Sequence, residues 1–303
     1  MEEQVTIDKI NELKKEKNAV ILAHNYQIPE IQDIADYVGD SLELSKKAAE
    51  TDADIIVFCG VHFMAESAKI LSPDKKVLLP VSDAGCPMAD MIDAHKLKVF
   101  KEEYPNIPVV CYIKSSAQVK AESDICCTSS NALRIVKSLK EDTILFVPDQ
   151  NLGNYIATKV PEKEIICWEG LCITHNRVKH NELDMVRKHR GNIKVLVHPE
   201  CNPQVVKKAD FVGSISEITE YVKGSNEKKF IIGIEMGILH SLRKQNPHKK
   251  FYLLSPSLVC YNMKKTSLED VYKALRDGKN EINIDKKAMD KARESLERML
   301  RVS

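Results

Sequence analysis

Short runs of apolar residues recur along the chain and predict buried β-strands. The runs at residues 19–25, 108–114 and 194–200 are alike in length and apolar content, and each precedes a stretch that fits a helix. Apolar runs that alternate with amphipathic stretches are typical of parallel sheets covered by helices. The pattern therefore predicts an α/β fold.

The same order of elements occurs three times, and an acidic residue marks each copy. Asp36, Asp124 and Asp210 end the first helical stretch of their copies and are separated by 88 and 86 residues. Periodic self-similarity of this kind indicates a repeated structural unit. Each copy of roughly 87 residues reads β-α-β-α-β-α-β. We expect three similar three-layer α/β/α domains with parallel sheets around a pseudo-threefold axis.

The repeat also sets the expected domain boundaries. At ~150 residues per domain, a chain of 303 residues suggests two domains, and the repeat changes that estimate to three. The last 38 residues form a helical tail that Thr266 or Ser267 can cap and that we expect to return to the first copy. The expected domains are residues 1–86 with 266–303, residues 87–172, and residues 173–265.

Composition narrows the function classes. The chain has 45 Lys and Arg residues and 44 Asp and Glu residues, which gives a net charge of +1. This balance argues against non-specific electrostatic binding to nucleic acid or to an anionic membrane. No stretch approaches the ~18 apolar residues of a transmembrane helix, and the polar first residues do not resemble a signal peptide. Nine cysteines, an odd number, then indicate reduced thiols in the cytoplasm.

Three of the cysteines occupy matching positions in the repeat. Cys86, Cys172 and Cys260 each follow the fourth strand of a copy, with spacings of 86 and 88 residues. Ligands of open parallel sheets gather beyond the carboxyl ends of the strands, so three copies around one axis could bring these thiols together. Three converging thiolates could hold a [4Fe–4S] cluster with one iron open to substrate. Zinc is the competing interpretation, and three unrelated buried thiols are the third.

The remaining cysteines give no such pattern. The chain contains no C-x-x-C motif, which argues against a structural zinc ribbon or a ferredoxin-type cluster. Cys201 follows a strand end and could line a pocket without being a ligand. The other five lie in or beside apolar strands and are interpreted as core residues: Cys59, Cys111, Cys126, Cys127 and Cys167.

Polar residues cluster at the predicted strand ends and form the candidate site. His24, His198, Tyr26 and Tyr112 are candidate proton carriers. Glu200 and Glu235 end strands in the third copy and could act as bases or bind an amine, although such residues are often structural. Ser and Thr residues precede the next helices, where they could bind anionic groups or act as ordinary N-caps. These hydroxyl residues are Ser41, Thr128, Ser129 and Ser130, and the two serines of the stretch 214–216, Ser214 and Ser216.

Eight short motifs, in order along nearly the whole chain, resemble the quinolinate synthase family. The motifs are AHNYQ at 23–27, GDSLELS at 39–45, DAGCPMAD at 83–90, CTSSNA at 127–132, PDQNLG at 148–153, WEGLCITH at 168–175, HPEC at 198–201 and CYNM at 260–263. The resemblance implies three α/β domains about a pseudo-threefold axis, with the active site between them. It also implies a [4Fe–4S] cluster held by Cys86, Cys172 and Cys260.

The resemblance further implies a reaction and roles for single residues. The family condenses iminoaspartate with dihydroxyacetone phosphate and releases phosphate and water, forming quinolinate for NAD synthesis. An enzyme that supplies iminoaspartate would be the expected partner. Residues that match the family's acid–base positions are Tyr26 and His24 near the triose, Tyr112 facing the cluster, and His198 with Glu200 at the imine end. Residues expected to bind substrate are Ser41, Lys114, Ser129, Ser214 and Glu235.

Three residues depart from the family pattern. Lys114 stands where the pattern has asparagine, and Ile215 and Ile234 stand where it has threonine. These changes leave open a diverged paralogue that keeps the cluster but acts as a dehydratase or transferase on another small anionic substrate. A non-catalytic metal or redox sensor is a further alternative.

Overall fold

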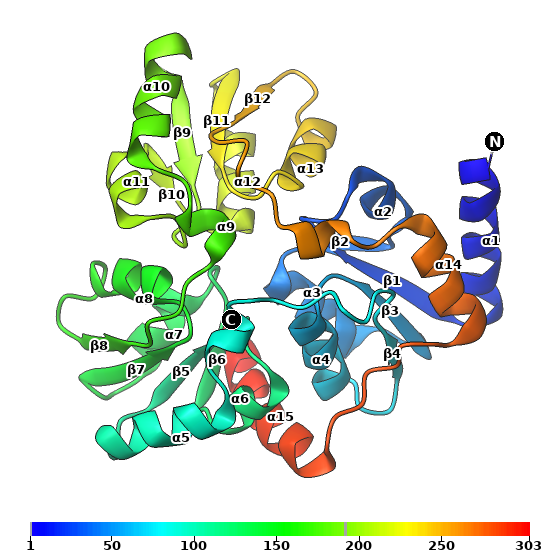
Figure 1. Cartoon of the computed structure of the whole chain (residues 1–303), viewed down its shortest axis with the longest axis horizontal. Coiled ribbons are helices and arrows are strands. Elements are labelled where there is room, and N and C mark those ends of the chain that lie inside the picture. Colours follow the sequence, from blue (N-terminus) through cyan, green and yellow to red (C-terminus); the bar gives the residue numbers. More distant parts are fainter. Residues whose placement is uncertain (1, 191–192) are drawn as a thin grey trace. The chain divides into compact units, whose positions relative to one another are not determined.

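The computed structural model describes residues 2–190 and 193–303 (Figure 1). The chain divides into two compact units, which we describe one at a time. The first unit comprises Met1–Asn106, Ile113–Cys126 and Tyr261–Ser303, and the second comprises Ile107–Tyr112 and Cys127–Cys260. No helix within the described residues combines the length and the apolar character needed to cross a membrane.

Three parallel four-stranded sheets confirm the predicted α/β fold and its threefold repetition. Their strand orders are β2-β1-β3-β4, β6-β5-β7-β8 and β10-β9-β11-β12. In each sheet the second strand in sequence lies at the edge, beside the first, so the order is the same three times. This common order places the ends of corresponding strands in corresponding positions of each sheet.

The first sheet carries an apolar core on the face covered by α1. Ile10 of α1 packs with Ile21 and Val57 of the central strands, and all three are fully buried. Its strands are β1 (Ala19–His24), β2 (Tyr37–Gly39), β3 (Ile55–Cys59) and β4 (Lys76–Leu78). Its helices are α1 (Glu2–Glu16), α2 (Pro29–Ile34), α3 (Ser41–Glu50) and α4 (His62–Leu71).

The second sheet follows the same plan. Its central strands are largely apolar, and Val110, Leu145 and Phe146 are fully buried. Its strands are β5 (Val109–Tyr112), β6 (Ile125–Cys127), β7 (Thr143–Val147) and β8 (Glu164–Cys167). The helices of this part of the chain are η1 (Ala89–Met91), α5 (Ala94–Glu103), α6 (Ala117–Ala121), α7 (Ala132–Ser138), α8 (Gln150–Ala157) and α9 (Ile173–Asn176).

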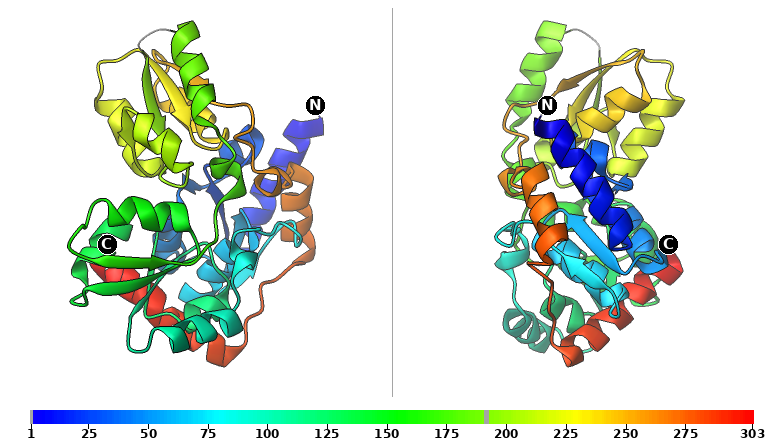
Figure 2. Two further views of the ribbon diagram at one scale, coloured as in Figure 1. Left: turned by 60° about the vertical axis from the view of Figure 1, so that its left-hand side comes forward. Right: turned by 90° about the vertical axis from the view of Figure 1, so that its right-hand side faces the viewer.

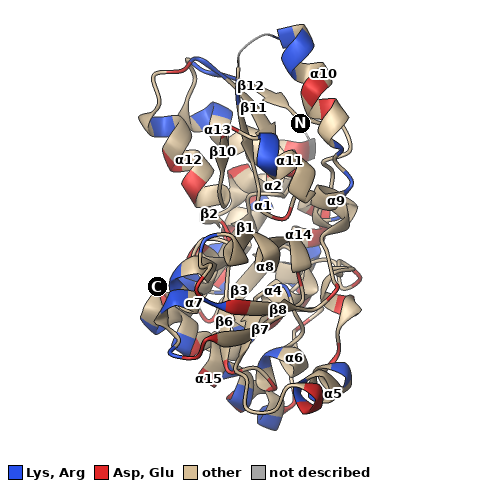
Figure 3. Cartoon of the chain, turned by 90° about the vertical axis from the view of Figure 1, so that its left-hand side faces the viewer, with Lys and Arg blue, Asp and Glu red and all other residues tan. Residues whose placement is uncertain are grey.

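The third sheet has its own apolar core, in which Val195, Val197 and Ile231 pack together. Its strands are β9 (Lys194–Val197), β10 (Phe211–Val212), β11 (Lys229–Gly233) and β12 (Lys250–Leu253). The helices around it are α10 (His180–Arg190), α11 (Pro203–Lys208), α12 (Ile215–Gly224) and α13 (Ile238–Gln245). Blue and red segments are mixed along the helices in the view of Figure 3, as the near-zero net charge leads one to expect.

The C-terminal tail forms η2 (Tyr261–Lys264), α14 (Leu268–Asp277) and α15 (Lys286–Val302). Ser267 caps α14 as predicted, since its hydroxyl accepts the Asp270 amide while the Asp270 carboxylate accepts the Ser267 amide. Helix α14 packs on α1 and on the first sheet (Figures 1 and 2). Helix α15 packs on α4 and, more extensively, on α6, where the Ser295 hydroxyl donates to the Lys120 carbonyl.

Candidate functional site

The loops before the three repeat-related cysteines share one backbone hydrogen bond. The donor lies three residues past the third strand of the repeat, and the accepting carbonyl lies two residues before the cysteine. The pairs, each 2.8 Å apart, are His62 with Ala84, Gln150 with Gly170, and Met236 with Leu258. Cys86, Cys172 and Cys260 therefore occupy equivalent local structures, which supports the repeat deduced from their spacing.

The accessibility of the thiols separates these three cysteines from most of the others. Cys86, Cys172 and Cys260 are half-buried and free of disulfides. Cys86 belongs to the first unit, and Cys172 and Cys260 belong to the second. Five of the other six are fully buried: Cys59, Cys111, Cys126, Cys127 and Cys201. Cys167, expected in the core, is half-buried at the edge strand β8.

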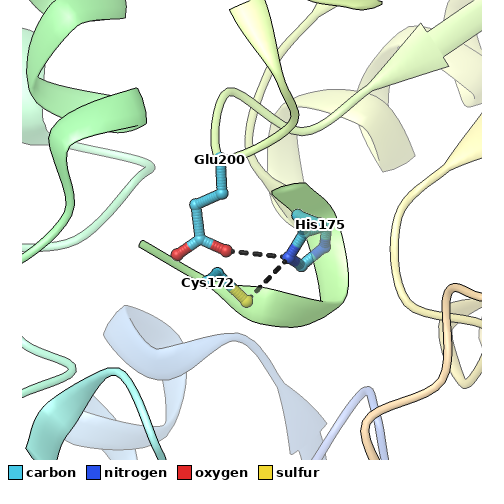
Figure 4. Close-up of side chains that lie close together, drawn as sticks. All are labelled: Cys172, His175 and Glu200. Carbon is cyan, nitrogen blue, oxygen red and sulfur yellow. Dashed lines mark hydrogen bonds and ion pairs between the residues drawn. The ribbon is translucent and has the colours of Figure 1, made fainter. Parts of the chain in front are cut away.

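Within the second unit, Cys172, His175 and Glu200 form a compact group (Figure 4). One ligand atom from each residue lies within 4.8 Å of the others. The Nδ1 atom of His175 is 3.2 Å from the Cys172 sulfur and 3.0 Å from a Glu200 carboxylate oxygen. Cys172 is the N-cap of α9, so a residue three positions later comes back to the same side of the helix. His175 therefore joins a candidate ligand to a buried carboxylate.

Glu200 is held in place by residues from several elements. It is fully buried in the turn after β9, where the Asn151 side chain donates to its carbonyl at 3.1 Å. The Glu200 amide donates to His198 Nδ1 at 3.3 Å, and the His198 ring stacks on that of His175 with centroids 5.0 Å apart. One carboxylate oxygen thus lies beside both stacked imidazoles, 3.0 Å from His175 Nδ1 and 3.4 Å from His198 Nδ1.

Tyr112, at the end of β5, completes this group. Its phenol donates a hydrogen bond to Glu200 and accepts one from Ser129. Burial raises the pKa of Tyr112 well above its ordinary value, and the Glu200 and Asp149 carboxylates raise it further. Tyr112 is therefore a neutral donor at neutral pH.

The pKa of His175 is also raised. Burial lowers it, but Cys172 and Glu200 together raise it more strongly, to about 9.

The raised pKa of Tyr112 predicts a pH effect on stability. An unfolded tyrosine loses its proton near pH ~10, whereas the folded one holds it to a higher pH. The stabilisation is complete below ~10 and declines as pH rises from that value towards the higher folded pKa, since only the unfolded chain releases its proton in this range. Denaturant titrations at pH 8 to 11 should show a smaller decline in the free energy of unfolding for Tyr112→Phe than for wild type. Parallel declines would contradict the assignment.

The first unit contains the other candidate proton carriers. His24 and Tyr26 are buried at the end of β1, with their rings edge to face and centroids 4.4 Å apart. The Tyr26 amide donates to His24 Nδ1 at 3.1 Å, and the Lys264 ammonium donates to the Tyr26 carbonyl. The structure thus brings these two side chains together, as their sequence proximity suggests.

The predicted substrate-binding residues have varied surroundings. Ser41 is the first residue of α3, whose N-cap is Asp40. The Ser214 hydroxyl caps α12 by accepting the Glu217 amide at 3.3 Å. Lys114 and Ser129 are half-buried. Both oxygens of the fully buried Glu235 accept backbone N–H groups.

Comparison with known proteins identifies the family to which the chain belongs. A model of the family described as "Quinolinate synthetase A protein" matches residues 8–301. A protein named quinolinate synthase from Alkaliphilus metalliredigens is 67% identical over 302 residues, covering 100% of both chains. Proteins of the same name from Caldicellulosiruptor saccharolyticus and Clostridium kluyveri are 56% and 52% identical, covering 97% and 100% of both chains. This chain belongs to the quinolinate synthetase A family.

Within this enzyme family, the three departures noted in the sequence have different surroundings. Ile234 follows β11 and is fully buried, and Ile215 opens α12 with 6% of its side chain exposed. Lys114 follows β5 and is half-buried. The two isoleucines therefore pack within the protein.

Two residues of the site were missed by sequence reasoning. His175 stands at the end of the WEGLCITH motif, and its spacing of three from Cys172 inside a helix was the available signal. Asp149 follows β7, caps α8 and accepts the Cys172 amide at 3.1 Å. It corresponds to Glu235, 86 residues later, so the repeat itself could have identified it.

Proposed function

We propose that this chain catalyses the condensation of iminoaspartate with dihydroxyacetone phosphate to quinolinate, releasing phosphate and water, in NAD biosynthesis. The observation that carries the proposal is the shared backbone hydrogen bond before Cys86, Cys172 and Cys260, which gives three cysteines outside any disulfide equivalent loops. The identity of 67% over 302 residues to a protein named quinolinate synthase supports the choice of reaction.

We further propose that these three cysteines hold a [4Fe–4S] cluster. Thiolates are the ligands that such clusters take, and these three are half-buried, free of disulfides and equivalent in the repeat. When bound, a cluster with three protein ligands supplies an iron that acts as a Lewis acid on a substrate oxygen. The residues present therefore fit the group.

Glu200 is the proposed base at the imine end of the substrate. A carboxylate accepts a proton from a substrate carbon or nitrogen only when it is held close and kept ionised. One hydrogen bond from Tyr112 and the contact with His175 compensate a negative charge on this carboxylate. His198 contacts the same carboxylate at 3.4 Å and offers a route for the proton to leave.

His24 and Tyr26 are the proposed proton carriers at the triose end. Their rings are in contact and buried, so a proton held there is shielded from bulk water. Anionic groups of the substrates are proposed to bind near the helix starts marked by Ser41, Ser129 and Ser214, with Lys114 adding a positive charge. The proposed setting is the cytoplasm, near an enzyme that supplies iminoaspartate, because an imine hydrolyses in water.

A genetic test separates this function from the diverged-paralogue alternative, which Lys114 favours. The gene should restore growth without nicotinate to a bacterial strain whose quinolinate synthase gene is deleted. A gene encoding Cys172→Ser is the matched negative control. The alternative predicts no growth with the wild-type gene but growth after Lys114→Asn, Ile215→Thr and Ile234→Thr are combined. That result would reject the proposed reaction for this chain.

A further inference from the structure

Asp149 and Glu235 make corresponding pairs of hydrogen bonds in consecutive repeats: each accepts an amide two or three residues later and the amide of a cysteine. One carboxylate oxygen of Asp149 accepts the Leu152 amide at 2.8 Å, and the other accepts the Cys172 amide at 3.1 Å. One oxygen of Glu235 accepts the Gly237 amide at 2.7 Å, and the other accepts the Cys260 amide at 3.0 Å. Each carboxylate thus joins the residues after a central strand to the loop that carries a cysteine.

Both carboxylates lie in the protein interior, where an uncompensated charge lowers the stability of the fold. Asp149 and Glu235 are fully buried, and an ionised side chain in such a place must be compensated by hydrogen bonds. Two backbone N–H donors supply this compensation to each carboxylate. Asp149 caps α8, but a serine or asparagine could cap that helix equally well, and the N-cap of α13 is Gly237, not Glu235. Helix capping therefore does not account for either charge.

The first repeat lacks this carboxylate. Val61, which is 88 residues before Asp149, occupies the corresponding position and is 2% exposed. The backbone hydrogen bond from His62 to Ala84 is nevertheless present, so the loop of Cys86 forms without the charge. The carboxylate is therefore an addition specific to the loops of Cys172 and Cys260.

We propose that Asp149 and Glu235 are positioning residues that hold the loops of Cys172 and Cys260 and tune the metal group they bind. This inference rests on the proposed cluster and deepens it. Each carboxylate engages a cysteine amide that could otherwise donate to a sulfur, and it adds a negative charge beside the ligand. Fewer hydrogen bonds to sulfur and more negative charge both lower the reduction potential of an iron–sulfur cluster.

The test uses Asp149→Asn and Glu235→Gln, which remove the charge with little change of size. The matched control is Asp40→Asn, because Asp40 is also a buried carboxylate that accepts two backbone N–H groups but no cysteine amide. After anaerobic reconstitution, both test variants should lose iron to a chelator about 10–100-fold faster than wild type. Their midpoint potentials should move to more positive values, and the control should match wild type in both measurements.

A second measurement does not depend on the cluster. In metal-free protein labelled with ¹⁵N-cysteine, the Cys172 and Cys260 amides should exchange slowly with solvent in wild type. The Cys172 amide should exchange at least about tenfold faster in Asp149→Asn and the Cys260 amide in Glu235→Gln, because each loses its acceptor. Unprotected amides in folded wild type would overturn the inference even if a variant failed to fold.

The outcomes distinguish this inference from the proposed function. Wild-type protein that binds no iron under anaerobic reconstitution would reject both. Wild type with a full cluster, together with variants that keep iron and potential unchanged, would reject only the positioning role of Asp149 and Glu235.

Discussion

Cys172→Ser protein, reconstituted under anaerobic conditions, should lack the broad visible absorbance of an iron–sulfur cluster and form no measurable quinolinate. A serine hydroxyl is a hard, weakly acidic oxygen donor, whereas these clusters are held by thiolates. Cys86→Ser and Cys260→Ser should behave alike, because the three loops share the same backbone hydrogen bond. Iron and sulfide analysis with visible spectra is the measurement.

Cys167→Ser is the matched control for these variants. Cys167 is half-buried like the proposed ligands, but it lies in β8, five residues before Cys172 and outside the repeat-related positions. Burial, with a smaller contribution from the Asp149 carboxylate, raises the pKa of its thiol to about 12, so it remains protonated at neutral pH. The control should keep iron and colour. Wild type that is colourless and zinc-loaded after a strictly anaerobic preparation would contradict the cluster.

Glu200→Gln should lower kcat by about 10²–10⁴-fold, the usual contribution of a general base, while the protein keeps its iron. Glutamine has nearly the same size, but its amide cannot accept the proton. Glu200 is also fully buried beside His175 and His198, so bulk solvent does not contact the carboxylate. Steady-state kinetics with iron quantified in the same sample separate loss of the base from loss of the cluster.

The control for this variant is Glu169→Gln. Glu169 belongs to the same WEGLCITH motif but is exposed to solvent. Its replacement should leave kcat and iron content unchanged. If Glu200→Gln raised KM alone and left kcat at the wild-type value, Glu200 would be a binding residue, and the proposed proton transfer would need another base.

The repetition of the fold was predictable because each repeat carries the same alternation of buried strand and amphipathic helix. The spacing of Asp36, Asp124 and Asp210 and that of the three cysteines reflect one strand order found in all three sheets. The strong packing of α15 on α6 was not predicted, because it joins segments about 170 residues apart and depends on surface shape. The boundaries after residues 86 and 172 stay a prediction.

The site was only partly predictable. Residues at strand ends, such as Glu200 and Tyr112, could be selected because parallel sheets place their ligands there. The role of His175 depends on the short helix that returns it to Cys172, and that of Asp149 on a contact across two loops. The only sequence signal for His175 was its spacing of three from Cys172, which becomes informative only once the helix is known. The only signal for Asp149 was its repeat relation to Glu235.

The most direct test of the account is product formation by the wild-type protein. Anaerobically purified protein with a full complement of iron and sulfide is mixed with dihydroxyacetone phosphate and freshly generated iminoaspartate, and quinolinate is quantified by mass spectrometry. The account predicts repeated turnover to quinolinate with one phosphate released per product. A fully loaded cluster that yields no quinolinate would contradict it.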